Sequence, residues 1–486
     1  MKAYVLEEPD LEFAGGNRHI DPRVGITDFG PADAESSTAP VSIPVGLIGP
    51  ARGVEGMRDW LDRCRQPIDA KASKHGQQML FPAFPGFRSD VAFGSELLFD
   101  DSLTRVIPSA AIKRLESTNP LHAAREAADL YSAEAESLAE TNRPKVIICV
   151  RPDELADAPS EKLFDVATES SSEGSSDETS PSDGSETVDF HDLLKATTLR
   201  LSCPLQIVRN ETWLGKTPKG AKRGLQDEAT RAWNIHTALY YKAGGSPWRM
   251  PRESTHLASC FVGVSFYRTL DKASLHTAMA QVFNERGDGV VVRGGPAKIS
   301  KDDRQPHLDS DAAAKLLSAA LDEYRRIHGH LPARIVVHKS SNYNPAETEG
   351  FESAASASGV ELLDLLWVLR RPTTRLFRIG QFPPLRGTVV ELDEANVLVY
   401  TRGTVEFYRA YPGMYVPRPV VMNIARSETA ISDVAREALS LSKMNWNNTQ
   451  FDGREPLTLR TSGRVGQILR YASLEDAVAT RYAYYM

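Results

Sequence analysis

The order of apolar segments in the second half of the chain limits its possible folds more than any other feature. Each segment is separated from the next by a short polar break or by a change of hydrophobic period. The expected elements, in order, are strands at 258–268, 277–283 and 289–293, a helix at 312–327, a strand at 334–338, a helix at 347–357 and a strand at 360–369. Three successive strands followed by alternating helices and strands predict an α/β domain for this half.

Two of these strands carry serine where a nuclease would carry acids. One is Cys260–Arg268, which contains Ser265, and the other is Arg334–Ser341, which contains Ser340. The element order is that of a ribonuclease-H-like core, and a nuclease site on such a core needs carboxylates that hold two divalent metals. Because serine supplies no negative charge, these strands predict a domain that has lost this chemistry.

The first half of the chain also alternates strands and helices. Strand patterns at 41–49 and 145–150, with helix patterns at 54–64 and 121–138, predict a parallel sheet that has helices on its faces. A further helix is expected to begin at Phe190. The whole chain is therefore expected to be α/β.

An acidic segment rich in serine interrupts this first half at residues 168–187. It contains six acids, no base and no aliphatic residue, so it accounts for most of the formal net charge of −7. Such a composition cannot repay the entropy of ordering, and we predict a disordered insertion within one domain. The stretch from Asp189 to Glu253 holds 11 Lys or Arg against 6 Asp or Glu. That excess suits a phosphate-binding site, although an ordinary solvated surface would fit it almost as well.

The sequence contains no apolar run of about 18 residues and no leader of the secretory kind, so we expect a cytoplasmic protein without a membrane span. Its four cysteines are widely spaced and form no C-x-x-C pair. Buried, reduced thiols are therefore expected rather than a structural zinc site or a disulfide framework.

Three segments carry a resemblance to a known family. Residues 445–460 (NWNNTQFDGREPLTLR) resemble the closing segment of Piwi domains, and residues 384–388 (PLRGT) resemble another stretch of the same domain. Residues 11–23 (LEFAGGNRHIDPR) resemble the opening of short prokaryotic Argonautes. This resemblance implies a Rossmann-like MID domain followed by a ribonuclease-H-like PIWI domain. The implied boundaries are an N-terminal segment at 1–40, which packs on MID and PIWI, the MID domain at 41–250 and the PIWI domain at 251–486.

In that family the MID domain binds the 5′-phosphate of a guide strand. The matching positions are His191, Lys195, Gln206 and Lys242. The spacing agrees independently, since His191 and Lys195 are four residues apart and share one face of a helix. By itself, an i, i+4 pair of this kind is common on the exposed faces of helices that bind no ligand. The resemblance further implies that the terminal carboxylate of Met486 holds Mg²⁺ against the guide phosphate.

The catalytic acids of the family are not matched. Its first and third acids fall at Ser265 and Ser340, and the fourth position falls near Asn447 or Asn448. Ser265 lies outside a G-x-S-x-G motif, which favours a structural serine over a nucleophile. The sequence therefore predicts no enzymatic activity. The alternative is an active guide-dependent endonuclease that uses displaced acids, for which the candidates are Asp288, Asp303 and Asp452.

The resemblance implies a guide-dependent short Argonaute in defence against phages and plasmids. Its guide would be RNA and its target DNA. The enzymatic activity used in defence would come from a partner protein in which an APAZ domain is fused to a TIR or sirtuin-like NADase or to a nuclease. Five arginines are candidates for contacts with the nucleic-acid backbone: Arg370, Arg371, Arg375, Arg378 and Arg386. A nucleotide-binding or scaffold protein that uses no guide is the third hypothesis, and it predicts no preference for a 5′-phosphate.

Overall fold

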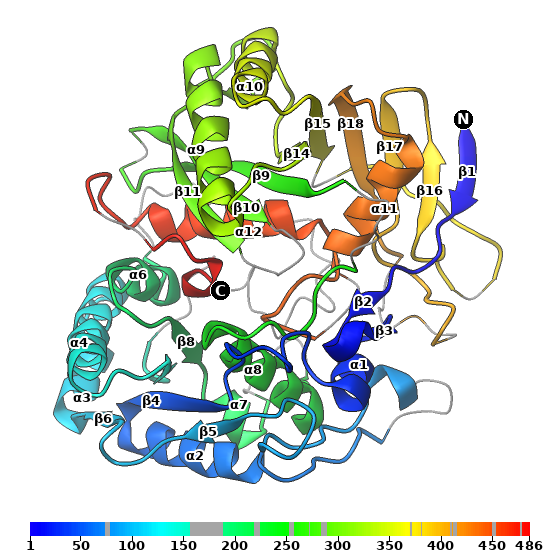
Figure 1. The fold of residues 1–486 in the computed structure, drawn as a ribbon. Coiled ribbons are helices and arrows are strands. Elements are labelled where there is room, and N and C mark those ends of the chain that lie inside the picture. The colour runs from blue at the N-terminus through cyan, green and yellow to red at the C-terminus, as the bar shows by residue number, and fades with distance from the viewer. Residues whose placement is uncertain are drawn as a thin grey trace.

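The computed structural model describes most of the chain. The described ranges are 1–72, 78–155, 188–217, 224–251, 257–271, 273–282, 289–369, 372–380, 382–408, 411, 416–449, 453–476 and 479–486. The predicted insertion at 168–187 lies outside them. Two sheets form the body of the molecule, and the last residues of the chain lie between them, close to helices of both halves (Figure 1).

The larger sheet has nine strands, and it contains every strand expected for the second half. In spatial order its strands are β1 (Lys2–Val5), β16 (Thr388–Glu391), β17 (Asn396–Val399), β18 (Val420–Arg426), β15 (Leu362–Leu369), β14 (Arg334–Lys339), β9 (Ser259–Arg268), β10 (Leu275–Val282) and β11 (Gly289–Pro296). Strands β9, β14 and β15 are parallel, whereas β10 and β11 continue antiparallel from β9. This mixed sheet agrees with the predicted ribonuclease-H-like order.

Helices cover both faces of the larger sheet. Apolar residues of α9 (Ser310–His328) and α10 (Pro345–Ala357) pack on one face, where Val262, Val264 and Val337 are buried. Helix α12 (Leu457–Leu469) crosses the other face so closely that a Cβ on Gly263 would lie 2.0 Å from the carbonyl oxygen of Thr458. Glycine at this position of β9 therefore permits the contact between helix and sheet.

The smaller sheet is parallel, as the first half of the sequence predicts. Its order is β5 (Glu96–Leu98), β4 (Ser42–Pro50), β7 (Val146–Val150) and β8 (Leu205–Val208), and β6 (Thr104–Ile107) also pairs with β4. All five residues of β7 are buried because helices cover both of its faces. Those helices are α2 (Ala51–Arg63) on one side and α3 (Ser109–Ser117), α4 (Pro120–Thr141) and α6 (Phe190–Thr197) on the other.

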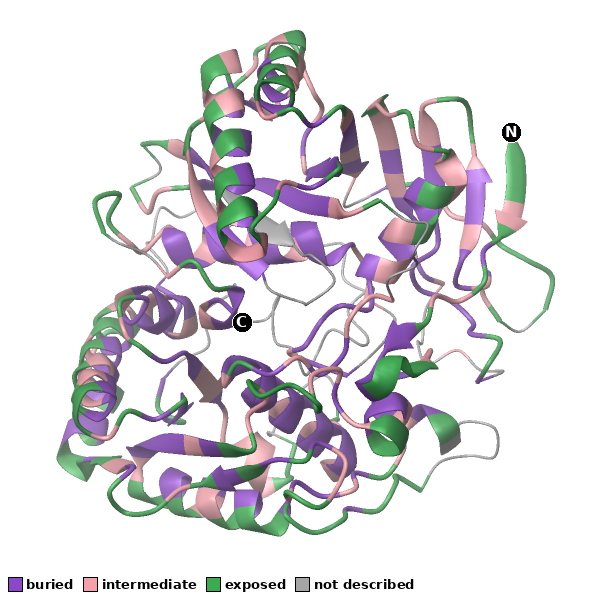
Figure 2. Ribbon diagram, viewed as in Figure 1, coloured by how far each residue is buried: buried purple, intermediate pink, exposed green. Residues whose placement is uncertain are grey.

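The remaining elements are short or connect the two sheets. They are α1 (Pro22–Phe29), α7 (Glu211–Leu214), α8 (Glu228–Lys242), α11 (Ile431–Leu441), the strand pairs β2 (Leu11–Glu12) with β3 (Arg18–His19) and β12 (Lys298–Ile299) with β13 (Pro306–His307), and the 3-10 turns η1 (Ala14–Gly16), η2 (Gln78–Leu80) and η3 (Tyr482–Tyr484). Figure 2 shows buried residues along the strands and exposed residues on the outer faces of the helices. No helix in the described ranges combines the length and apolarity needed to cross a bilayer. The four cysteines all lie in the described ranges, are buried and form no disulfide with one another, as expected.

The first residues of the chain belong structurally to the larger sheet. Strand β1 pairs antiparallel with β16, although almost the whole chain separates the two strands. Farther along, the buried carboxylate of Glu8 forms ion pairs with Arg386 at 2.8 Å and with Lys443 at 3.0 Å. The N-terminal segment is therefore fixed to the second half by a strand and by buried charges.

Candidate functional site

Helix α6 presents two of the predicted site residues. Asp189 caps its N-terminus by accepting a hydrogen bond from the backbone N–H of Asp192 at 3.1 Å. His191 and Lys195 follow one turn apart on the helix, and Lys195 is only 1% exposed. A fully buried ammonium group is costly unless polar partners surround it, so its surroundings indicate what the site binds.

Three of the predicted residues and the last residue of the chain converge. Lys195 Nζ donates to the carbonyl oxygens of Leu205 at 3.2 Å and Tyr484 at 3.3 Å, and it also contacts the main-chain oxygen of Met486. Lys242, at the end of α8, is likewise buried, and its Nζ donates to Gln206 Oε1 at 2.9 Å and to the Met486 oxygen at 3.3 Å. Residues from α6, β8, α8 and the C-terminal tail thus form one buried polar cluster, the candidate pocket.

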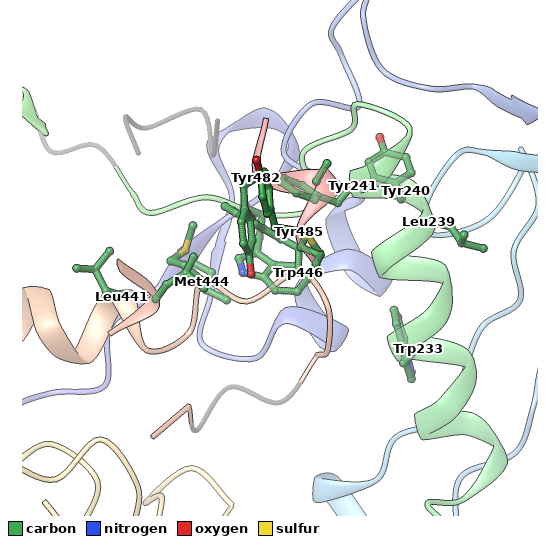
Figure 3. Close-up of a cluster of buried hydrophobic side chains, with 14 of the residues drawn as sticks. Trp233, Leu239, Tyr240, Tyr241, Leu441, Met444, Trp446, Tyr482 and Tyr485 are labelled. Carbon is green, nitrogen blue, oxygen red and sulfur yellow. Dashed lines mark hydrogen bonds between the residues drawn. The ribbon is translucent and has the colours of Figure 1, made fainter. Parts of the chain in front are cut away.

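Aromatic packing holds the C-terminal tail against this pocket. Tyr241, one residue before Lys242, stacks on Trp446 with ring centroids 4.5 Å apart. Tyr485 is fully buried, and its hydroxyl donates to the Ala479 carbonyl at 2.8 Å. Figure 3 shows Tyr241, Tyr482, Tyr485 and Trp446 gathered beside α8. This cluster fixes the main chain at Met486, where both lysines meet it.

An arginine that sequence reasoning missed joins the pocket from the second half. Arg464 lies on α12, and its Nη2 is 2.8 Å from Asp192 Oδ1 and 2.6 Å from His191 Nδ1. Arg464 is far from the predicted residues in sequence and belongs to a helix on the other sheet. No spacing or pattern could have identified it, and only the fold brings it beside α6.

The pocket is dominated by positive charge. Burial, the Lys242 ammonium and then the Arg464 guanidinium hold the pKa of Lys195 well below its usual value. Burial and Arg464 lower the pKa of Lys242 to about 7. The pKa of His191 is also well below normal, because of burial, Arg464 and Lys195. The pocket therefore disfavours its own cationic forms, and a bound anion would relieve that penalty.

The same region contains a possible cluster of metal ligands. Ligand atoms of Asp189, His191 and Asp192 lie within 4.8 Å of one another. Arg464 contacts both His191 and Asp192 and so supplies the positive charge that a metal would otherwise bring. At Met486 the main-chain oxygen is contacted by both lysines. A divalent ion would fit there only if a bound ligand supplied most of its oxygen ligands.

The two positions that were predicted to have lost their catalytic acids are neighbours, one on β9 and one at the end of β14. Lys339 is level with Val264, and the backbone N–H of Ser340 donates to the Val264 carbonyl at 3.0 Å, so Ser340 comes level with Ser265. Ser265 is 3% exposed. Asp303, a proposed displaced acid, is instead paired with His307 Nε2 at 2.8 Å. The other two, Asp288 and Asp452, lie outside the described residues.

The structure corrects one of the predicted nucleic-acid contacts. The Arg386 side chain is fully buried, where it pairs with Glu8 and donates to the Leu439 carbonyl at 3.1 Å and to Ser442 Oγ at 3.0 Å. This arginine anchors the N-terminal segment, so its predicted contact with a nucleic-acid backbone is wrong. Arg378 is exposed and Arg375 is partly exposed, whereas Arg370 and Arg371 lie outside the described residues.

Comparisons with known proteins place the fold. No family model and no curated protein matches the sequence. Among solved structures, Clostridium butyricum Argonaute bound to a guide DNA and a 19-mer target DNA is 14% identical, with a TM-score of 0.66 over 97% of this chain and 53% of its own. Drosophila Piwi is 14% identical, with a TM-score of 0.59 over 99% of this chain and 56% of its own. A. aeolicus Argonaute is 15% identical, with a TM-score of 0.58 over 99% and 55%.

These matches establish the architecture. The chain has the MID–PIWI fold of Argonaute and Piwi proteins, as the sequence predicted, and it spans about half the length of the matched structures.

Proposed function

We propose that this chain binds the 5′-phosphate of a guide strand in the pocket formed by His191, Lys195, Gln206 and Lys242. One observation carries the proposal: the ammonium groups of Lys195 and Lys242 are buried at a common oxygen, and burial together with nearby cations lowers their pKa values. A phosphate would offset this repulsion through charge-assisted hydrogen bonds. Comparing 5′-phosphate with 5′-hydroxyl guides tests the proposal.

Arg464 is expected to act as a third cation toward the guide phosphate. Replacing it with alanine should weaken binding of a 5′-phosphorylated guide by about tenfold or more, because a hydrogen bond to a charged group contributes about 1.5–3 kcal/mol. Binding of a 5′-hydroxyl guide should change little, and both affinities can be measured by fluorescence anisotropy. Arg436→Ala, a change at an exposed arginine of α11, is the matched control. An equal loss for both guides would contradict a phosphate contact.

The proposal extends to guide and target as the family resemblance implies. The guide would be RNA and the target DNA, and base pairing between them would supply the sequence specificity. The C. butyricum structure holds a DNA guide and a DNA target. Binding of RNA and DNA guides, each offered RNA and DNA targets, would decide between these chemistries. A tighter complex with a DNA guide would overturn the RNA assignment.

Mg²⁺ belongs to the proposal only together with a guide. Lys195 and Lys242 contact the Met486 oxygen, so a divalent ion would bind there through phosphate oxygens in addition to the terminal carboxylate. Its chemistry would be to neutralise phosphate charge, and it would take no part in cleavage. Guide affinity should therefore be lower after chelation of divalent ions, and an unchanged affinity would remove Mg²⁺ from the proposal.

The chain is proposed to recognise its target without cutting it. Ser265 and Ser340 stand side by side at the positions that need carboxylates, and Asp303 is engaged by His307. A partner chain with an APAZ domain and a TIR, sirtuin-like or nuclease effector would supply the output, in defence against phages or plasmids. The alternative is cleavage by displaced acids.

One assay separates the two outcomes. The chain purified alone, loaded with guide and given target and Mg²⁺, is expected to leave the target intact. The complex purified from its native operon is expected to consume NAD or degrade DNA once target is added. Metal-dependent cleavage by the chain alone would favour the endonuclease alternative. Absence of any copurifying chain would count against the partner.

A further inference from the structure

The segment that follows β15 exposes large apolar side chains to water. Phe377 is 77% exposed, Ile379 is fully exposed at 105%, and Phe382 is 42% exposed. Exposed apolar groups this close together in sequence are unusual on a surface and mark a contact site. Arg378 Nε donates a hydrogen bond to the Phe382 carbonyl at 3.0 Å.

The register places this loop at the edge of the sheet that contains Ser265 and Ser340. Strands β9, β14 and β15 are parallel, so the loop leaves β15 at the same edge at which β14 ends in Ser340. Strand β18 is antiparallel to β15, and β17 is antiparallel to β18, so Tyr400 after β17 lies at this edge as well. The Tyr400 hydroxyl accepts a hydrogen bond from the backbone N–H of Leu376 at 2.6 Å. The residue before Phe377 is thereby fixed at this edge.

The charge of the loop indicates the chemistry of its partner. Residues 370–382 contain four arginines and no acid. Arg378 lies between Phe377 and Ile379 in sequence, and Arg375 is two residues before Phe377, so both of these apolar side chains have a cation beside them. Apolar side chains flanked by arginines fit nucleic acid, in which the cations meet phosphates and the apolar groups meet or unstack bases.

We propose that Phe377 and Ile379 form a wedge that contacts the bases of the guide–target duplex at this sheet edge, while Arg375 and Arg378 hold its phosphates. This inference rests on the proposed function. It assigns the loop to duplex capture, a step separate from holding the 5′-phosphate of the guide.

The variant Phe377→Ala plus Ile379→Ala tests the wedge. Its affinity for a 5′-phosphorylated guide should stay within about twofold of wild type, whereas the affinity of the loaded protein for target should fall by about tenfold, the loss expected when a base contact is removed. A 2-aminopurine series in the target should show unstacking with wild type that the variant lacks. Val106→Ala plus Leu392→Ala, which also removes two exposed apolar side chains, should leave both affinities unchanged.

A second variant, Arg375→Ala plus Arg378→Ala, should weaken target binding and reduce its dependence on salt concentration. Unchanged target affinity and unchanged 2-aminopurine fluorescence in the apolar variant would overturn the wedge. The wedge would also be overturned if the apolar variant lost only its affinity for a partner protein, because the loop would then be a protein-docking surface. If wild type shows no preference for a 5′-phosphate, the proposed function itself fails, and the two failures are therefore distinguishable.

Discussion

Replacing Lys195 and Lys242 together with alanine should remove most of the preference for a 5′-phosphorylated guide. Wild type is expected to bind the phosphorylated guide on the order of a hundredfold more tightly than its 5′-hydroxyl counterpart, since each charge-assisted contact contributes about 1.5–3 kcal/mol. The double variant should bind both guides weakly, with at most the roughly tenfold preference that Arg464 contributes. Equilibrium binding of the two labelled oligonucleotides at one salt concentration measures both effects.

The single variant Lys242→Ala should lose less than half of the total. Lys242 is the largest charged influence that depresses the pKa of Lys195, so removing it lets the remaining lysine carry a full charge more easily. Both lysines contact the same oxygen and would bind the same phosphate, so the effects of replacing them on affinity are expected to be non-additive.

A matched control separates the pocket from general electrostatics. Lys113→Ala plus Lys145→Ala also replaces two lysines with alanine, but both side chains are exposed on the same half of the chain. This control should retain the phosphate preference. Equal affinity for the two guides in wild type, or an equal loss in the control, would refute the assignment of the pocket.

The local sequence pattern was sufficient to predict the elements of the larger sheet up to Leu369. Hydrophobic periodicity and the order of strands and helices along the chain can both be read from short segments. Every element predicted between 258 and 369 is present, with its ends shifted by only a few residues. The strands after Leu369 were not predicted. Strands β16 and β17 have only four residues each, and β1, at the opposite end of the chain, completes their edge. Pairing between such distant short strands leaves little periodic signal in either of them.

Residues of the candidate pocket were predicted only from the family resemblance and from the helix spacing. His191 and Lys195 share a helix face, so their proximity followed from spacing, whereas Gln206 and Lys242 depended on the resemblance. Arg464 reaches the pocket from α12, and no local pattern relates it to α6. Arg386 failed as a predicted contact because sequence cannot distinguish a surface arginine from one buried against Glu8.

Buried contacts at the end of β14 fix the main chain next to Ser340. Lys339, the residue before it, is fully buried, and its Nζ lies 2.9 Å from Glu347 Oε1 and 2.7 Å from Ser341 Oγ. Glu347 also accepts hydrogen bonds from the backbone N–H groups of Leu308 at 2.8 Å and Asn344 at 3.2 Å. Its second oxygen is 2.9 Å from His307 Nδ1. One buried carboxylate therefore joins β14, α10 and the segment that precedes α9.

Replacing Glu347 with alanine should destabilise the protein by about 3–5 kcal/mol, the usual cost of leaving a buried charge without its partner. Lys339 would remain buried in the variant. Burial already lowers the pKa of Lys339 to about 8, although the Glu347 carboxylate acts to raise it. Urea unfolding followed by tryptophan fluorescence measures the change, since Trp367 is paired with Lys339 across β14 and β15.

The same helix offers a matched control for this prediction. Glu352 pairs with Arg426, but both side chains are more than a third exposed, so Glu352→Ala should cost less than about 1 kcal/mol. Adding Lys339→Met to Glu347→Ala should restore part of the lost stability, because the unpaired buried charge is then gone. Equal urea midpoints for Glu347→Ala and Glu352→Ala would mean that water or another group stabilises the Lys339 charge in place of Glu347. The buried ion pair would then not be what fixes the end of β14.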